Sequence, residues 1–444
     1  MHLVGSNVAE GTPFIYRIQP IVLQYSGPLD PATVNVANIR VNNMDAYKRK
    51  SRHYASLNYD PATWQITITA PNSWTSGQIF EAVITGITDE VGNPVADATI
   101  TWGVKADASL KAYYYTATGI NFYYDFTPDT ATGLTSKYTY FYGIGGDATW
   151  ETADDTSTYR IEYVINPAFR IDSYTYYDHG PDLLPNTADD FAASFTQYHY
   201  DENGLGLGYT YTSAGADKIL FNGDDTAYHV AFLKDDEGIF LGTVKHSSPG
   251  ADNTSVSNDD FVIYTLDGNK FTANYTIGRV GADLVPGTAD DVIRYDNTYT
   301  RDENGFLVET EYYHRGTDEI PGTGDDYRYR YINTLDENNR TIRTVTVFAG
   351  LDVLLDTPDD SISSYSDIFH NQHGQTVMSR SFSSPGLNGQ WFTPDDNIGS
   401  ERYYSFSASG QMIRSYVIHG GGDGDISTPG DNYISYEALY QVLD

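Results

Sequence analysis

The stretch GTDEIPGTGDDYRYRYINTLDENN, residues 316–339, contains the unit from which most of this chain is built. It begins with an acidic, glycine-rich segment that carries three aspartates. The segment YRYRYINT (327–334) follows, and its alternation places three tyrosines on one face of a β-strand. DENN (336–339) is then typical of a tight hairpin turn at positive φ, and a second strand leads to the next acidic segment.

The acidic segment recurs nine times, with successive copies 35, 35, 35, 31, 35, 34, 36 and 35 residues apart. Each copy has glycine two residues before its first acidic position, and those positions are Asp147, Asp182, Asp217, Asp252, Asp283, Asp318, Asp352, Asn388 and Asp423. In eight copies two aspartates follow seven and eight residues later: Asp154 and Asp155, Asp189 and Asp190, Asp224 and Asp225, Asp259 and Asp260, Asp290 and Asp291, Asp325 and Asp326, Asp359 and Asp360, and Asp395 and Asp396. The ninth copy is one residue longer and has Asp431 near its end. A fixed period of this length indicates a repeat architecture.

One repeat therefore consists of an acidic loop, a strand, a tight turn and a strand. If the hairpins join in sequence order, all tight turns lie along one edge of the sheet and all acidic loops along the other. Successive loops would then be about 10 Å apart, because neighbouring strands are about 4.8 Å apart. So long a sheet is expected to coil, fold over or close into a barrel or propeller-like form, and the sequence leaves this choice open.

Two copies are expected to differ from the others. The copy after Asp252 is several residues shorter and should form a shorter hairpin. Residues 111–145 form an opening copy that has tyrosine-rich strands but no acidic loop, and it is expected to cap the array.

The composition supports an all-β protein and excludes several classes of function. The 444 residues include 39 tyrosines and 40 glycines, which favour strands and turns. A formal net charge of −34 excludes the basic surface that nucleic acids or anionic membranes require. No cysteine is present, so disulfides and thiolate metal sites are excluded, and no apolar run is long enough to insert into a membrane. The N-terminus, MHLVGSNVAEG, lacks the pattern of a signal peptide.

Residues 1–107 carry a different pattern of short alternating segments. QYSGPLDPATVNVANIRV (24–41), LNYDPATWQITIT (57–69) and GQIFEAVITGITDEVGNPVADATITWGV (77–104) resemble the bacterial Ig-like domain of the surface-layer (SbsA-type) family. The resemblance implies an Ig-like β-sandwich that acts as an extracellular spacer or display module, without catalytic residues. The remaining residues, 108–444, form the β-hairpin array, whose DENG turns and tyrosine-rich strands resemble the YD repeats of bacterial shell and toxin proteins.

The acidic loops are interpreted as calcium sites. A turn needs one Asp or Asn, whereas three carboxylates held together repel one another and should raise their own pKa values unless a cation lies between them. Ca²⁺ takes six to eight oxygens, which carboxylates and backbone carbonyls can supply. Mg²⁺ requires a tighter octahedral geometry, and zinc or copper would favour Cys or His, which the loops lack. Many loops also offer a threonine hydroxyl: Thr152, Thr187, Thr288, Thr323, Thr357 and Thr393.

One Ca²⁺ is expected in each acidic loop, with weaker sites in the copy that has Asn388 and in the longer last copy. Eight such ions would change the net charge from −34 to about −18 and relieve much of the self-repulsion of the chain.

These observations predict a non-enzymatic, extracellular or cell-surface structural repeat protein of a surface, matrix or filament. Self-assembly through sheet edges is the expected mode of association. The alternative is an adhesin or carbohydrate-binding module that binds a glycan or a surface protein through exposed aromatic residues such as Trp391. A third hypothesis, a polysaccharide hydrolase, requires two carboxylates outside the repeat. His370 and His373 lie in a predicted turn without the helix or Glu of a zinc protease.

Overall fold

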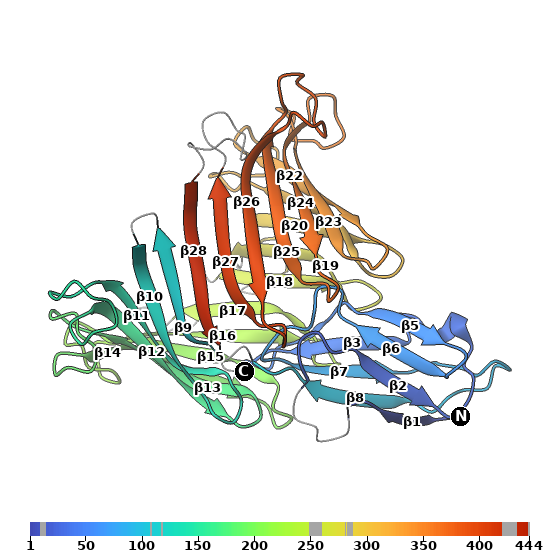
Figure 1. The fold of residues 1–444 in the computed structure, drawn as a ribbon, viewed down its shortest axis with the longest axis horizontal. Helices are drawn as coiled ribbons and strands as arrows, with labels where there is room; N and C mark the ends of the chain where they lie inside the picture. Colours follow the sequence, from blue (N-terminus) through green and yellow to red (C-terminus); the bar gives the residue numbers. More distant parts are fainter. Residues whose placement is uncertain are drawn as a thin grey trace.

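The computed structural model describes residues 1–8, 15–106, 109–116, 119–247, 260–279, 281, 287–419 and 433–442. The described residues are almost entirely strands and turns, which confirms the all-β fold class. They form two small four-stranded sheets and one closed antiparallel barrel (Figure 1). No helix among them has the length and apolar composition needed to cross a bilayer.

The N-terminal strands form the two four-stranded sheets. One contains, in spatial order, β1 (Leu3–Ser6), β2 (Ile21–Tyr25), β6 (Gln65–Thr69) and β5 (Ser56–Asp60). The other contains β4 (Lys50–Arg52), β3 (Ile39–Met44), β7 (Ile79–Ile84) and β8 (Ala98–Gly103). A single 3₁₀ turn, Pro31–Thr33, follows Asp30, which caps it by accepting from the amide of Ala32.

Alternation along these strands builds a core between the two sheets. Ile21 and Leu23 of β2 face it from one sheet, Phe80 of β7 faces it from the other, and the indoles of Trp74 and Trp102 are buried beside them. Trp74 and Trp102 meet edge to face with ring centroids 5.3 Å apart. We refer to β1 to β8 as the sandwich.

The remaining described strands form the barrel, in which each strand pairs with its neighbours in sequence and β28 pairs with β9. The strands are β9 (Ser109–Thr116), β10 (Gly119–Pro128), β11 (Thr135–Gly143), β12 (Thr156–Asn166), β13 (Arg170–Asp178), β14 (Phe191–Tyr200), β15 (Gly206–Ser213), β16 (Thr226–Lys234), β17 (Phe240–Ser247), β18 (Asp260–Leu266), β19 (Thr272–Arg279), β20 (Val292–Arg301), β21 (Leu307–His314), β22 (Tyr327–Leu335), β23 (Thr341–Phe348), β24 (Ser361–His370), β25 (Thr376–Ser384), β26 (Asn397–Phe406), β27 (Met412–His419) and β28 (Tyr433–Val442).

This closure settles what the sequence left open and corrects one expectation. Residues 111–145 do not cap a free end, because β9 forms the seam of the barrel with β28. Closure leaves the array without a free edge, so edge pairing is confined to the two small sheets. The expected shortening of the copy after Asp252 is not seen in its hairpin, because β18 and β19 form seven residue pairs, as many as β20 and β21.

The tight turns use one hydrogen-bond pattern. In the first DENG turn the Asp201 carboxylate accepts from the amides of Asn203 at 3.0 Å and Leu205 at 2.8 Å, while Gly204 has φ +78°. The same pattern recurs at Asp235, Asp267, Asp302, Asp336 and Asn371. All these turns lie at one end of the barrel, as the meander predicts, and we call it the turn end.

Tyrosines line one face of the barrel sheet. Tyr163, Tyr174, Tyr198 and Tyr209 form a continuous series of ring contacts with centroids 5.5–6.4 Å apart. Burial raises the pKa of Tyr228, and the neighbouring Tyr211 and Tyr174 raise it further. The tyrosine rings therefore pack against one another across neighbouring strands.

The sandwich docks against the turn end through the segment YKRKSR, residues 47–52 (Figure 1). The Tyr47 ring stacks on Tyr198 at 4.7 Å. The Lys48 ammonium donates to the carbonyl of Ala168 at 2.7 Å, and its burial lowers its pKa to about 8. Lys50 forms a parallel bridge with Ile239. A basic segment of an acidic protein is therefore used to join its two parts.

Candidate metal sites in the acidic loops

The acidic loops connect barrel strands at the end opposite the turns, which we call the loop end (Figure 1). The loops that contain Asp147, Asp182, Asp217, Asp318, Asp352 and Asn388 lie within the described residues. Asp290 and Asp291 are described, but their partner Asp283 lies outside the described residues, as do Asp252, Asp259, Asp423 and Asp431 and the side chain of Asp260.

Glycine is needed two residues before the first acidic position because the second aspartate packs against it. A Cβ on Gly215 would overlap the Asp224 carboxylate, and a Cβ on Gly350 would overlap that of Asp359. The glycine in the repeat thus lets the two ends of each loop approach closely.

Backbone amides orient the three carboxylates of each loop. In the loop after β21, Asp318 Oδ1 accepts from the Ile320 amide at 2.8 Å and Asp326 Oδ2 from the Gly322 amide at 2.6 Å. Asp325 Oδ2 accepts from the Asp318 amide at 3.4 Å. Equivalent bonds to the first or third aspartate occur at Asp182, Asp190, Asp217, Asp352, Asp360 and Asp396.

The oxygens of the loop converge on one threonine hydroxyl. Thr323 Oγ1 lies 2.8 Å from Asp325 Oδ1, 3.1 Å from the Ile320 carbonyl, 3.2 Å from Asp318 Oδ1 and 3.5 Å from Asp326 Oδ1. A hydroxyl has one proton to donate. Four oxygen acceptors therefore converge on a single hydroxyl proton, and Asp318 and Asp325 are exposed to the solvent beside it.

The same convergence recurs in other loops. Thr187 Oγ1 lies 2.8–3.3 Å from one oxygen of each of Asp182, Asp189 and Asp190 and from the Leu184 carbonyl. Thr357 has the corresponding four neighbours at 2.7–3.5 Å. The arrangement is therefore a property of the repeat rather than of one loop.

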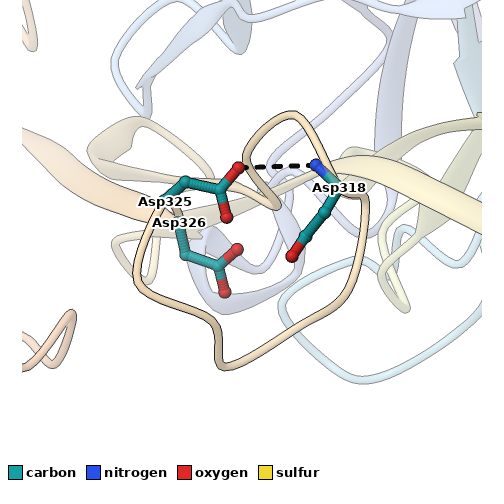
Figure 2. Close-up of side chains that lie close together, drawn as sticks. All are labelled: Asp318, Asp325 and Asp326. Carbon is teal, nitrogen blue, oxygen red and sulfur yellow. Dashed lines mark hydrogen bonds between the residues drawn. The ribbon is translucent and has the colours of Figure 1, made fainter.

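The loop with Asp318, Asp325 and Asp326 brings its carboxylates closest together. One oxygen from each lies within 4.8 Å of the others, and this is the one such group found among the described residues. Figure 2 shows Asp325 and Asp326 side by side on one side of the loop and Asp318 opposite them. This spacing is short enough for one cation to contact all three carboxylates.

The hydrogen bonds of the second aspartate lower its pKa. The Thr317 hydroxyl and amide, followed by the Thr323 hydroxyl, hold the pKa of Asp325 well below its usual range. The loop threonine likewise lowers the pKa values of Asp154, Asp189, Asp359 and Asp395. The expectation that mutual repulsion raises the pKa values is wrong for these carboxylates, because the hydroxyl and amide donors outweigh repulsion at their exposed positions.

The third aspartate is anchored to the barrel by tyrosines that sequence reasoning did not find. Tyrosine hydroxyls donate from Tyr123 to Asp155 at 3.1 Å, from Tyr313 to Asp326 at 2.5 Å and from Tyr365 to Asp396 at 2.9 Å. These three aspartates are buried. The tyrosines stand 32, 13 and 31 residues before their aspartates, so no constant spacing could have revealed them.

Two loops replace part of the oxygen set with an amide. Asn222 stands in place of the threonine, and its Nδ2 donates to Asp217 Oδ2 at 2.7 Å. Asn388 Nδ2 donates to Asp395 Oδ1 at 2.8 Å and to Thr393 Oγ1 at 3.1 Å. The added protons satisfy oxygens that remain unmatched in the other loops, which makes these two loops the poorer candidates.

The other candidate residues have structural partners. His370 Nε2 lies 2.8 Å from the Thr341 carbonyl, and the His373 ring contacts the neighbouring Gln372. Trp391 packs edge-on against Tyr365 with ring centroids 5.9 Å apart. These contacts give the histidines and the indole roles in turns and packing.

No protein-family model matches this chain, and no curated protein matches it in sequence. Solved structures give weak matches. The match with the TcdB2-TccC3-Cdc42 structure covers 96% of this chain and 18% of the matched chain, at 12% identity and a TM-score of 0.35. The N-terminal part of the bacterial S-layer protein SbsC matches 43% of this chain and 42% of its own, at 12% identity and a TM-score of 0.19.

A porin-like protein from Bacteroides uniformis matches 59% of this chain and 94% of its own, at 11% identity and a TM-score of 0.27. With TM-scores below 0.5, none of these likenesses assigns a fold family or a function. The present chain also spans less than half the length of the first two proteins.

Proposed function

We propose that this chain is an extracellular structural repeat protein of a cell surface, matrix or filament, whose barrel is stabilised by calcium bound in its acidic loops. The observation that supports the proposal is the convergence of four oxygens on one hydroxyl proton in the loops of Thr187, Thr323 and Thr357. A cation would satisfy the oxygens that this proton cannot.

Calcium suits these loops better than other metal ions. Carboxylates and a backbone carbonyl are hard oxygen ligands, and Ca²⁺ accepts six to eight of them in irregular geometry, with water completing the shell. The loops are exposed on one side, which leaves room for such waters. A Ca²⁺ ion bound among three carboxylates would also lower the electrostatic repulsion between acidic residues in a chain of formal charge −34.

Calcium loading favours a location outside the cell. Extracellular calcium-binding modules have dissociation constants of about 10⁻⁴–10⁻³ M, which suits millimolar calcium. With no cysteine in the sequence, disulfides cannot stabilise this protein outside the cell, and bound metal can take their place. The near-identical loops fit a structural rather than a catalytic role, because a catalytic site requires a departure from the repeat.

Counting bound calcium tests the proposal. Elemental analysis after equilibrium dialysis should find several Ca²⁺ per chain, and the double substitution Asp325→Asn and Asp326→Asn should remove one of them. The matched control is Asp356→Asn, because Asp356 lies in an acidic loop but pairs with Arg330 at 2.6 Å instead of joining a carboxylate set. The control should bind as many ions as the parent chain.

A parent chain that binds no Ca²⁺ at millimolar concentration would rule the metal out, as would a double variant with an unchanged number of ions. The assembly part of the proposal has a separate test. Electron microscopy should show ordered association in calcium, and dispersed single chains at every calcium concentration would contradict the filament form.

An adhesin is the second candidate function, and the exposed apolar residues of the loop end favour it. Leu351 and Leu387 are fully exposed, and Ile219 and Phe221 are largely exposed. Loop tips of this kind can contact a glycan or a surface protein. A glycan array should then show binding that falls when Leu351 and Leu387 are replaced by serine, and an array without any binding would remove this candidate.

A further inference from the structure

A cavity of about 360 Å³ lies where the sandwich meets the turn end of the barrel. Arg52 and Tyr54 line it from the sandwich, and Tyr264, Phe271 and Arg301 line it from the barrel. Its volume falls within the range of small-molecule sites. The acidic loops lie at the opposite end of the barrel, so this cavity is separate from the proposed calcium sites.

Arg52 lines this cavity, and one of its donors has no partner. The side chain is 9% exposed, and its two terminal nitrogens donate to the carbonyls of Val41 at 3.1 Å and Val36 at 2.6 Å. Its Nε–H is buried and has no hydrogen-bond partner. A buried donor without an acceptor costs about 1–3 kcal/mol, so the Arg52 guanidinium is not fully satisfied by the chain.

Arg301 lines the same cavity. Its Nη2 donates to the Thr272 carbonyl at 2.8 Å, Nε and Nη1 are buried without a close acceptor, and the guanidinium interacts with the Tyr54 hydroxyl. Both guanidinium groups lie over the Phe271 ring, Arg52 at 4.9 Å and Arg301 at 5.3 Å from its centroid. Tyr54 stacks on the same ring at 4.8 Å, so the two cations are held by aromatic contacts.

Neither arginine has a carboxylate partner in the described part of the chain, although the sequence contains 60 acidic residues. The other cations of the cavity do: Arg49 pairs with Asp45 at 2.7 Å and Lys270 with Asp235 at 2.8 Å. The acid that influences Arg52 electrostatically is Asp267, and its carboxylate accepts from two amides of its own turn. Among the cations that line the cavity, Arg52 and Arg301 are thus the two without a carboxylate in salt-bridge contact in the described part of the chain.

We propose that this cavity binds an oxyanion, the carboxylate, sulfate or phosphate group of a small ligand, between Arg52 and Arg301. Guanidinium groups recognise such groups through several N–H donors at once. The aromatic walls formed by Tyr54, Tyr264 and Phe271 suit a ligand that carries a ring or an aliphatic body beside its anion. A sugar that bears a carboxylate or a sulfate has this chemistry.

Isothermal titration of the full chain in calcium tests the site with three probes: sulfate, glucuronate and glucose. Sulfate and glucuronate should bind saturably and glucose should not. Tighter binding of glucuronate than of sulfate would identify a carboxylated ligand, and the reverse order a sulfated or phosphorylated one. Arg301→Met should weaken binding about tenfold or more, because it removes hydrogen bonds to a charged group.

The matched control is Arg414→Met, because Arg414 also lies over a ring, that of Tyr416 at 4.7 Å, but is paired with Glu437. It should leave the affinity unchanged. Arg301→Lys keeps the charge without the planar fork and should weaken binding by an intermediate factor, which decides the matter if Arg301→Met does not fold. Equal binding of glucose and glucuronate, or equal sulfate affinity in the parent chain and both Arg301 variants, would overturn the proposal.

Discussion

The two ends of the barrel join the same strands but satisfy their polar groups in different ways. At the turn end, Asp201 accepts from two amides and from Lys234 at 2.8 Å, and the sandwich covers the hairpins beside it. At the loop end, Thr323 supplies one proton to four oxygens. The turn end is thus held by contacts within the chain, whereas the proposed calcium sites would make the stability of the loop end depend on ions from the solvent.

Withdrawing calcium should have the largest effect, and it should act first at the loop end. Each occupied site adds about 1.4 kcal/mol when free Ca²⁺ is about ten times the dissociation constant, so several sites together should shift the melting temperature strongly. Calorimetric melts in millimolar calcium and in excess EGTA measure the shift.

Tryptophan emission can then show where unfolding begins. Trp150 and Trp391 lie in acidic loops, while Trp74 and Trp102 are buried in the sandwich. A variant in which Trp150 and Trp391 are replaced by phenylalanine should retain a late transition in EGTA, reported from the sandwich. Superimposed melts with and without EGTA would remove the distinction between the two ends.

Raising the pH from 10 to 12 should destabilise the turn end even in calcium. Burial raises the pKa values of Tyr54, Tyr163 and Tyr209 to about 12, above the ordinary value of about 10 in the unfolded chain. A raised folded-state pKa contributes stability that is complete below pH 10 and disappears as the pH rises through 12. Tyrosinate absorbance and circular dichroism should therefore change together, and titration near pH 10 with the fold intact would contradict the packing described for these rings.

A pair of truncations compares packing at the two ends directly. Phe271 is 3% exposed at the turn end and contacts Tyr54, so Phe271→Ala should cost about 3–5 kcal/mol of unfolding free energy. Leu351 is 100% exposed at the loop end, so Leu351→Ala should stay within about 0.5 kcal/mol of the parent. Urea unfolding in calcium measures both values, and similar costs would mean that the loop end is packed as tightly as the turn end.

Local features of this fold could be predicted from the sequence because they repeat. The alternation in YRYRYINT and the DENG turns predict strands, hairpins and positive φ, and even Asn339 and Lys270 take the positive φ that glycine has in other turns. The separation of turns and acidic loops to opposite ends follows from the meander alone. These features depend on neighbouring residues and neighbouring strands only.

The remaining features depend on contacts between residues far apart in the sequence. Closure requires β28 to meet β9, and no pattern within either strand encodes that pairing. The basic segment 47–52 is visible in the sequence, but its docking site on the turn end is not. In the loops, the positions of the aspartates were predicted, whereas the convergence on Thr323 and the anchor from Tyr313 needed three-dimensional placement.

Asn388→Asp should have a small effect, and its sign should depend on calcium. Without calcium the change removes the amide bonds to Thr393 and Asp395 and adds a like charge, so stability should fall. With calcium it adds a carboxylate ligand, and the affinity of this loop should rise about tenfold, or about 1.4 kcal/mol.

Asn371→Asp is the control from the other end, because Asn371 holds a tight turn by accepting from two amides, as aspartate does in the neighbouring turns. Its effect on the melting temperature should be the same with and without calcium, since the turn end gives a cation no unmatched oxygens. Calorimetric melts of both variants in calcium and in EGTA measure these shifts. The shift in melting temperature should change sign between the two conditions for Asn388→Asp and keep its sign for Asn371→Asp. A change of the same sign at Asn388 in both conditions would mean that the loop end, like the turn end, is stabilised by the chain alone.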